Sequence, residues 1–201
     1  MKKKFYWIIF LGSMITSLNA QTAKEAFITF PDPSLLPLNT NTRMDLMDLF
    51  QINQNAVIEN DLGDSISIRQ MQDDYIQIQS GNSDTEIIIL HMINESKVIC
   101  VIQTISTPVP DSNLDFYTIN WKKLDAKAFI NPVDKSWFIK EGDDFPALDI
   151  SLMKFHYDPE KQILLQTYTT PSYLSIEDQK RIEGHIKESN KGYKWNGIQF
   201  E

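Results

Sequence analysis

The sequence predicts an α+β protein: a mainly antiparallel β-meander sheet, with two N-terminal helices and one C-terminal helix packed on or beside it. Three runs of β-branched and aromatic residues, divided by turn-forming clusters, predict the meander strands Glu86–Met92, Lys97–Ile105 and Leu114–Trp121. The middle run is apolar on both of its alternating faces, with Val98, Cys100 and Ile102 on one and Ile99, Val101 and Ile105 on the other. We therefore expect a central strand that is covered on both sides.

Residues 1–20 have the layout of a secretory signal peptide. Basic residues precede an apolar run, Phe5–Ile15, that is too short to span a bilayer, and the small residue Ala20 stands at the expected cleavage site before Gln21. No cysteine lies near this site, so lipid attachment is not expected. We expect the protein to be periplasmic or secreted. The alternative is that residues 1–20 are retained as a membrane anchor.

We expect residues 21–201 to form a single α+β domain, because this length suits one hydrophobic core. The whole chain has 19 lysine and arginine residues and 27 acidic ones; removing Lys2, Lys3 and Lys4 leaves 16 against 27, a formal charge of −11. This acidity argues against nucleic acid and anionic lipid surfaces as partners. After processing, no stretch is long and apolar enough to predict a stable membrane span.

The spacing of apolar residues predicts two helices near the start of this domain. The first covers Thr22–Phe30 and ends before Pro31, and the second covers Arg43–Gln51 with Thr42 as its N-cap. Between them, the three prolines of Pro31–Leu38 exclude a helix interior or a central strand. This segment should be extended, with its leucines pressed on the core.

Two stretches carry a resemblance to a known family. The runs FPDPSLLPLNTNTRMDLMDLF and ESKVICVIQTISTPVPDSNLDFYTINWKKL resemble a family of Bacteroidales envelope proteins catalogued as domain-of-unknown-function family number 3256. The resemblance covers most of residues 21–201. It implies export and an envelope setting, and it carries over no catalytic residue, ligand or partner.

Alternation and turn residues predict the remaining elements. Two half-exposed strands, Ser65–Met71 and Tyr75–Gln79, precede the meander and are joined by a tight turn at Asp73-Asp74. After the meander come one helical turn at Asp125–Ile130, a hairpin of Leu152–Tyr157 and Gln162–Tyr168, a surface helix from Ser175 to about Ser189, and a closing hairpin at Tyr193–Phe200. Its Asn196-Gly197 pair predicts a type I′ turn.

No pattern in the sequence specifies a catalytic centre, a cofactor or a metal. The three histidines, His91, His156 and His185, are too scattered to form a metal pair. The acidic pairs Asp73-Asp74, Asp143-Asp144 and Asp158/Glu160 lack the spacing of a calcium loop, so we interpret them as turn acids. Motifs of a serine hydrolase or of a phosphate-binding loop are also missing.

Two further residues have specific expectations. Cys100 is the single cysteine, so no intramolecular disulfide can form, and its apolar neighbours predict a buried, unreactive side chain. Ser65 is a candidate for O-glycosylation, because Asp64-Ser65-Ile66 resembles the Asp-Ser/Thr-apolar pattern used in Bacteroidales and stands at a predicted turn. Such short patterns also occur by chance.

Three functions compete. The first is a non-enzymatic envelope module that binds another envelope protein or a glycan, or helps an assembly, without a cofactor. The second is a small-molecule carrier, in which a curved sheet forms an apolar pocket lined by Ile87, Ile89, Val101 and Phe116. The third is an envelope glycan hydrolase that uses acidic pairs, with Trp121, Trp137 and Trp195 as sugar platforms rather than core aromatics.

Overall fold

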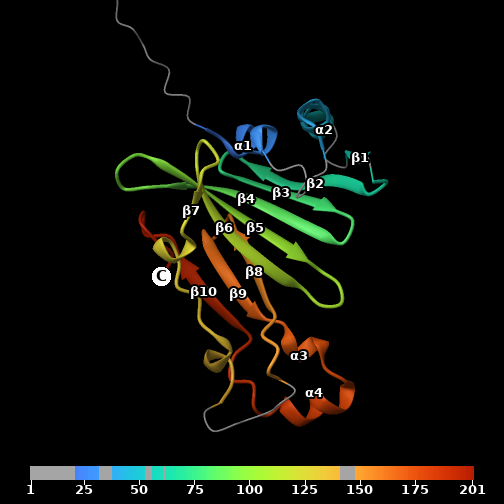
Figure 1. Cartoon of the computed structure of the whole chain (residues 1–201), viewed down its shortest axis with the longest axis vertical. Helices are drawn as coiled ribbons and strands as arrows, with labels where there is room; N and C mark the ends of the chain where they lie inside the picture. Colours follow the sequence, from blue (N-terminus) through green and yellow to red (C-terminus); the bar gives the residue numbers. More distant parts are fainter. Residues whose placement is uncertain (1–20, 32–37, 53–55, 61, 141–147) are drawn as a thin grey trace, which may run out of the picture.

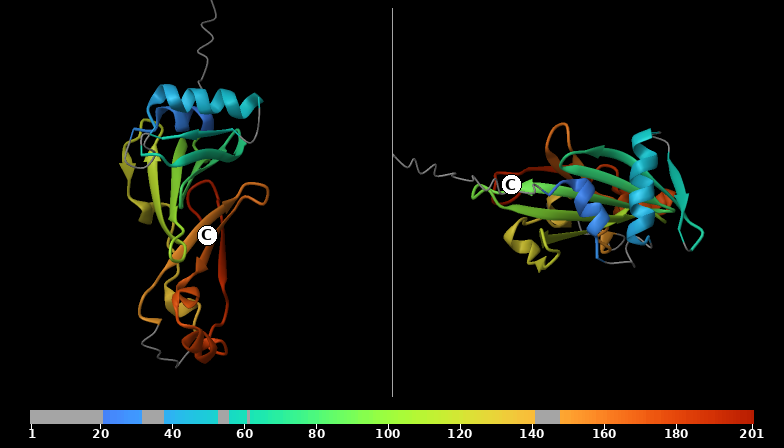
Figure 2. Two further views of the ribbon diagram at one scale, coloured as in Figure 1. Left: turned by 90° about the vertical axis from the view of Figure 1, so that its right-hand side faces the viewer. Right: turned by 90° about the horizontal axis from the view of Figure 1, so that it is seen from above.

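The computed structural model describes residues 21–31, 38–52, 56–60, 62–140 and 148–201. These residues form a seven-stranded antiparallel sheet in the order β1 to β7 and a three-stranded antiparallel sheet in the order β10-β9-β8 (Figure 1). Helices α1 and α2 cover one face of the larger sheet, and the smaller sheet lies on its other side (Figure 2). The predicted α+β class is confirmed. No helix among the described residues is long and apolar enough to cross a membrane.

The seven-stranded sheet is a meander in which each strand pairs with its neighbour in sequence. Its strands are β1 (Val57–Glu59), β2 (Ser65–Gln72), β3 (Tyr75–Ser80), β4 (Ser83–His91), β5 (Lys97–Ile105), β6 (Asp111–Thr118) and β7 (Lys123–Leu124). The predicted strand Lys97–Ile105 is confirmed as β5. The strand predicted at Leu114–Trp121 begins and ends earlier, as β6. It ends at Thr118 because Trp121 has a φ of 61° in a turn, which is closed by the hydrogen bond from the Trp121 N–H to the Thr118 carbonyl.

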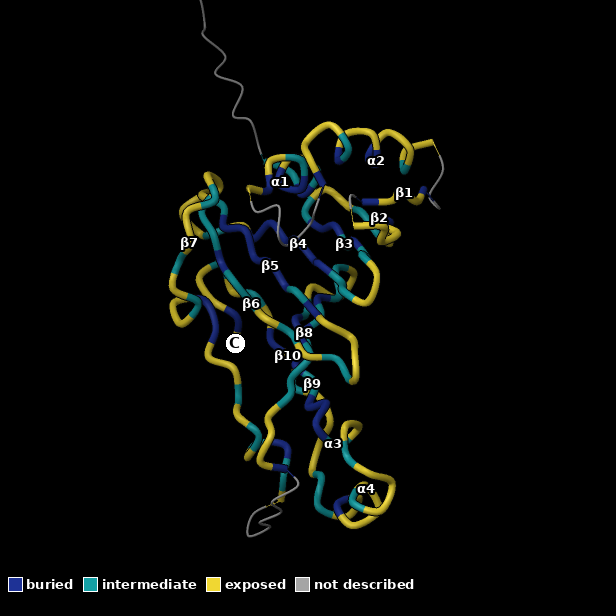
Figure 3. The backbone as a smooth tube through the Cα atoms, turned by 45° about the vertical axis from the view of Figure 1, so that its right-hand side comes forward, coloured by how far each residue is buried: buried dark blue, intermediate teal, exposed yellow. Residues whose placement is uncertain are grey.

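Strand β5 is buried on both faces, as predicted. Ile99 and Val101 belong to the apolar cluster under the helices, and Cys100 and Ile102 to the cluster on the opposite face. Figure 3 shows the buried stretches concentrated in β4 and β5. Cys100 has no exposed surface, and burial raises the pKa of its thiol well above the ordinary value, so the predicted burial is confirmed.

Helix α1 (Ala23–Thr29) confirms the first predicted helix. It begins with a capping box, in which Thr22 and Glu25 each accept a backbone N–H of the other. Helix α2 (Thr40–Ile52) starts earlier than predicted, and the assignment of Thr42 as its N-cap is wrong. Asn39 caps the helix instead, because its side-chain oxygen accepts the Thr42 N–H at 3.0 Å.

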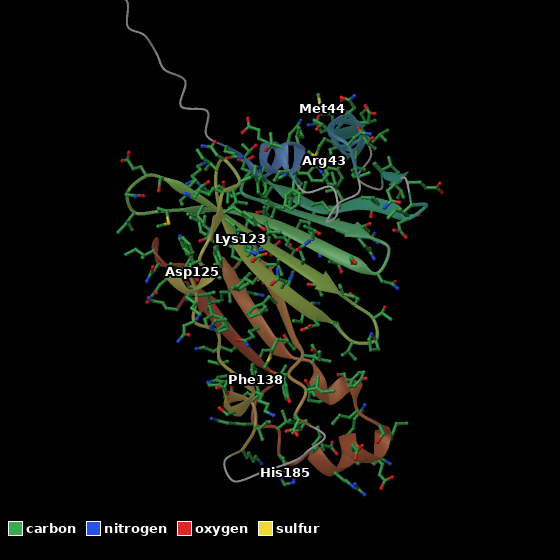
Figure 4. All side chains as sticks on the ribbon, in the orientation of Figure 1. Arg43, Met44, Lys123, Asp125, Phe138 and His185 are labelled. Atoms are coloured by element: carbon green, nitrogen blue, oxygen red, sulfur yellow. The ribbon has the colours of Figure 1, made fainter. Side chains whose placement is uncertain are left out.

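A buried arginine joins the two helices. Arg43 of α2 (Figure 4) is buried and donates to the carbonyl oxygens of Phe27, Ile28 and Phe30 at the end of α1. A cation at this position also interacts favourably with the helix dipole. Arg43 therefore acts as a structural cap that fixes α1 against α2.

The three-stranded sheet is built from β8 (Met153–Asp158), β9 (Ile163–Tyr168) and β10 (Asn190–Lys194). The first two strands confirm the second predicted hairpin. Short helical segments surround the sheet: the 3-10 turns η1 (Ala126–Ala128) and η2 (Lys135–Trp137), and helices α3 (Thr170–Tyr173) and α4 (Ile176–Ile182). The turn predicted near Asp125 is thus η1, with Asp125 as its cap.

The C-terminal helix is shorter than predicted. Ser175 caps α4 through the Asp178 N–H as expected, but the helix ends at Ile182 rather than near Ser189. Beyond it the backbone pairs with another segment, because Lys140 N–H donates to the His185 carbonyl and Lys187 N–H to the Phe138 carbonyl. These tertiary hydrogen bonds prevail over the low helical stability of a segment with few apolar residues.

The closing hairpin is present, but its turn is not of type I′. That type needs a positive φ at both central residues, whereas Gly197, at 90°, is the only residue of the turn with one. Gly197 is also required by packing, because a Cβ there would lie 2.5 Å from the Ile93 side chain. The Gly197 carbonyl accepts the Ile93 N–H, so this hairpin is fixed against the β4–β5 turn.

Candidate binding cleft between the two sheets

The two sheets meet where the edge of the smaller one lies against the face of the larger one. Strand β8 pairs with β9 on one side only, so alternate backbone N–H groups point away from its own sheet. Side chains of the larger sheet accept them: the N–H groups of Met153, Phe155 and Tyr157 bond to Asp111 Oδ1, Ser112 Oγ and Glu86 Oε2 at 3.0, 2.9 and 3.0 Å. The backbone N–H groups on this edge of β8 therefore donate to side chains rather than to another strand.

Glu86 is the buried centre of this seam. Its side chain is only 3% exposed, and besides the Tyr157 N–H it accepts the Tyr75 hydroxyl at 3.0 Å and contacts His156 Nδ1 at 3.0 Å. A buried carboxylate is tolerated only when such donors replace water. Glu86 thus joins β3, β4 and β8 at a single point.

The pKa values around Glu86 follow from this arrangement. The hydrogen bond to Glu86 raises the pKa of His156, because the carboxylate favours the protonated ring. Burial and the neighbouring Glu86 raise the pKa of Tyr75, so its hydroxyl keeps its proton and remains a donor. Burial and Glu86 also raise the pKa of Asp84. These three pKa shifts are those expected of a buried hydrogen-bond network with a structural role.

A cleft of about 610 Å³ opens beside this network. Its walls come from residues 72–75 around the β2–β3 turn, residues 88–91 of β4, the β8–β9 turn, and Lys194 with Trp195 after β10. Tyr75 and Tyr157 line it together, with ring centroids 5.9 Å apart, and both are held by Glu86. Figure 2 shows the β8–β9 hairpin and the C-terminal turn extending toward the larger sheet.

The aromatic wall of the cleft is fixed by hydrogen bonds and ring contacts. The indole N–H of Trp195 donates to the His91 carbonyl at 2.7 Å, and its ring packs on Phe129 and Phe200. The His91 ring in turn contacts Asp74 at 2.9 Å. A ligand would therefore meet side chains that are already ordered.

The cleft carries charges of both signs. Asp73 and Asp74 lie on the larger sheet, while Lys161 and Lys194 come from the smaller one. Asp74 pairs with His91 and Lys161 with Asp158. Neither Asp73 nor Lys194 forms an ion pair with any residue in the described ranges. These two charged groups are thus open to a ligand.

The predicted histidines and acids are placed in different parts of the molecule. His91 lies at the cleft, His156 at the seam, and His185 just after α4, at the end of the molecule distant from α1 and α2 (Figure 4). Among the described residues, no group of three potential ligands could hold a metal ion. Asp158 caps its own turn by accepting the Glu160 and Lys161 N–H groups. Asp143 and Asp144 lie outside the described residues.

Of the three tryptophans considered as sugar platforms, Trp195 alone lines the cleft. Trp121 packs on Phe30 and donates to Thr29, and Trp137 packs on Phe138. Residues 32–37 of the predicted extended segment Pro31–Leu38 and the cleavage residue Ala20 lie outside the described ranges, whereas Leu38 is buried in the core under the helices. Ser65 is exposed at the start of β2, and its O-glycosylation stays a prediction.

The apolar pocket expected for a carrier is not formed by the residues predicted to line it. Ile87, Ile89 and Val101 pack beneath the helices, whereas Phe116 packs on the opposite face of the sheet. All four are at most 3% exposed. The prediction that they line a common pocket is wrong, because successive side chains of a strand alternate between its two faces and both faces are filled.

Sequence reasoning missed the importance of Glu86 and of the Asp73-Asp74 turn. The sequence did hold an indication for Glu86. It lies two and four residues before Ile88 and Leu90 in β4, so its side chain is on the same face of the strand as theirs, toward the smaller sheet. An acid at an inward position of an apolar strand predicts a buried polar partner. No comparable pattern linked Asp73 to Trp195, because they lie far apart in sequence.

The fold and the cleft define a class: an α+β protein of two packed antiparallel sheets with a polar, aromatic-lined cleft between them. The chain belongs to the family described as Protein of unknown function (DUF3256), whose model matches residues 15–200, so the resemblance found in the sequence is confirmed. The chain is also similar to the structure of a domain of an uncharacterized protein from Porphyromonas gingivalis W83, with a TM-score of 0.76 and 24% identity over 89% of this chain and 98% of that one. At this identity the likeness shows the fold. No curated protein matches the chain.

Proposed function

We propose that the protein is an exported, non-catalytic binding module of the bacterial envelope, and that the cleft between its sheets holds part of an envelope protein or a glycan. The observation that supports this most directly is the cleft itself. It combines ordered aromatic side chains with unpaired charged groups from both sheets. Binding sites commonly pair apolar surface with a few well-placed polar groups.

Hydrogen bonds hold the aromatic residues that line the cleft, and this favours a binding role for them over a purely structural one. The Tyr75 hydroxyl and the Tyr157 backbone N–H donate to Glu86, and the Trp195 indole N–H donates to the His91 carbonyl. Ordered side chains lose little conformational entropy when a ligand binds. A cleft with this lining is therefore prepared for association.

Export and the absence of catalysis belong to the same proposal. The basic and apolar pattern of residues 1–20 supports export, and the family resemblance supports an envelope setting. N-terminal sequencing of protein from the envelope fraction should begin at Gln21. A chain that still carries Phe5–Ile15 would support the retained anchor instead.

The binding proposal is tested by co-sedimentation of the purified protein with envelope fragments of the bacterium that makes it. The natural protein should sediment with them, and a Lys194→Gln, Trp195→Phe double variant should remain in the supernatant. The matched control is Lys191→Gln, which changes a neighbouring lysine of β10 that lies outside the cleft lining. Equal sedimentation of all three proteins would contradict the proposal.

The same samples distinguish binding from hydrolysis. A non-catalytic module should release no new reducing sugar ends from the envelope fragments during incubation. Release that depends on Asp73 or Asp74, the cleft acids, would favour the glycan hydrolase instead.

A further inference from the structure

We infer that the ligand of the cleft is a glycan, read through its hydroxyl groups by side chains on both walls. This inference rests on the proposed function and narrows the ligand from an envelope protein or glycan to an oligosaccharide. Three features of the cleft support it: the chemistry of its side chains, the occupied backbone of its walls, and the two charged groups without an ion-pair partner.

The side chains of the cleft suit a ligand with many hydroxyl groups. Trp195 supplies partly exposed ring surface, while Gln72 and Gln162 add amides and Asp73 adds a carboxylate. Tyr75 and Tyr157 are almost fully buried, at 1% and 8% exposure. A sugar hydroxyl both donates and accepts, so it can pair with a carboxylate, an amide or an ammonium group. The apolar faces of sugar rings in turn match the aromatic surfaces.

The backbone of the walls offers little to an extended peptide. Strand β4 pairs with β5 as far as His91, but with β3 only as far as Ile88. Beyond Ile88, the Ile89 N–H donates to the Asp74 carbonyl and the His91 carbonyl accepts the Trp195 indole N–H. Lys194 exchanges two backbone hydrogen bonds with Glu201, and the Asp73 and Asp74 carbonyls accept from Ala23 and Ile89. Peptide recognition by strand addition needs an exposed edge, and in β4 this is limited to the strand end at Leu90 and His91.

The two unpaired charges lie on opposite walls and have complementary roles. Asp73 can accept hydrogen bonds from ligand hydroxyls, and Lys194 can donate to them. Hydrogen bonds to charged groups are stronger than those between neutral groups. A neutral or mildly charged oligosaccharide that bridges the cleft would satisfy both groups at once.

The test follows the indole N–H resonance of Trp195 in the nitrogen-15-labelled protein while four probes are added separately. The probes are cellotetraose, chitotetraose, tetragalacturonate and the capped pentapeptide Ala-Lys-Tyr-Asp-Ala. We expect at least one oligosaccharide to shift the Trp195 resonance in a saturable way. The resonance of Trp137, which lies outside the cleft, serves as the internal reference.

Variants then assign the binding to the two walls. Asp73→Asn and Lys194→Gln should each weaken binding of that oligosaccharide by about threefold to tenfold, as expected for one exposed hydrogen bond. The matched controls Asp45→Asn, on α2, and Lys191→Gln, on β10, should leave the affinity unchanged. Unfolding midpoints close to that of the natural protein show that each variant remains folded.

The other outcomes overturn the inference in distinguishable ways. If the pentapeptide alone shifts Trp195, the cleft binds a ligand but the glycan assignment is wrong, and the proposed function stands. If no probe shifts it, the glycan assignment fails, and co-sedimentation with envelope fragments decides the proposed function separately. Equal weakening by the control variants would place the oligosaccharide outside the cleft.

Discussion

The two faces of the seven-stranded sheet are closed in different ways. The helix-covered face is sealed by apolar packing, with Phe27, Leu46 and Met47 fully buried against the strands. The opposite face receives the edge of a second sheet through Asp111, Ser112 and Glu86. Close packing leaves no space for a ligand, whereas docking by an edge leaves an open cleft beside the seam. The proposed binding function therefore belongs to the second face.

The largest expected effect tests the helix-covered face. Replacing Leu46 by alanine should lower the free energy of unfolding by about 3 kcal/mol, because the side chain is fully buried between α2 and the sheet and its loss leaves a cavity. Chemical denaturation at constant pH measures this loss. The neighbouring exposed Leu49 supplies the control, since Leu49→Ala should change stability by less than about 0.5 kcal/mol.

The affinity for the oligosaccharide provides a second measurement on the Leu46→Ala variant. Leu46→Ala should leave the affinity for the oligosaccharide that binds the natural protein unchanged, since α2 lies on the face of the sheet away from the cleft. Equal losses for Leu46→Ala and Leu49→Ala, or a loss of affinity, would contradict the separation of the two faces.

The next prediction tests the polar seam. Glu86→Leu should cost about 2 kcal/mol, because the Tyr157 N–H and the Tyr75 hydroxyl lose their buried acceptor. Hydrogen exchange should show where the effect falls. We expect faster exchange at Tyr157 and along β8, with the amides of α1 and α2 unchanged.

A different exchange pattern would remove the distinction between the faces. If Glu86→Leu accelerated exchange equally in β8 and in the helices, the seam would be an ordinary part of one cooperative core. If the variant were as stable as the natural protein, Glu86 would be no structural acceptor at all.

The elements of the fold were largely predictable, and their ends and mutual contacts were not. A run of β-branched residues that is apolar on both faces identified β5, and alternation on both sides of a turn identified the β8–β9 hairpin. The end of α4 depends on hydrogen bonds to residues 138–140, which local sequence does not encode. The cleft depends on contacts such as Trp195 with His91, separated by 104 residues, so no spacing rule could place them together.

A smaller effect tests the corrected start of α2 on the helix-covered face. Asn39→Ala should cost about 1 kcal/mol, because its side chain accepts the Thr42 N–H and satisfies an end group of the helix. Thr42→Ala should change stability by less than about 0.5 kcal/mol, since alanine is favourable inside a helix. Thermal unfolding of the two variants compares them directly. A greater loss for Thr42→Ala would restore Thr42 as the cap.

The smallest expected effect is a pH dependence that belongs to the seam and not to the helix-covered face. Hydrogen bonding to Glu86 raises the pKa of His156 in the folded protein above its unfolded value of about 6.5. Its contribution to stability should therefore be fully present below about pH 6.5 and be lost as the pH rises through the folded pKa. Because the ring is 40% exposed, solvent screening should keep this contribution below about 1 kcal/mol.

The free energy of unfolding, measured from pH 5.5 to 9 for the natural protein and for His156→Gln, isolates this contribution. Glutamine can still donate to Glu86 but does not titrate, so the difference in stability between the two proteins should shrink as the pH rises. In a Glu86→Gln background the same substitution should show almost no pH dependence, because the carboxylate that raises the pKa is gone. Leu46→Ala should instead cost the same at every pH, since it removes only apolar contacts. A pH-independent difference for His156→Gln would mean that the seam, like the helix-covered face, is held together without a titrating group.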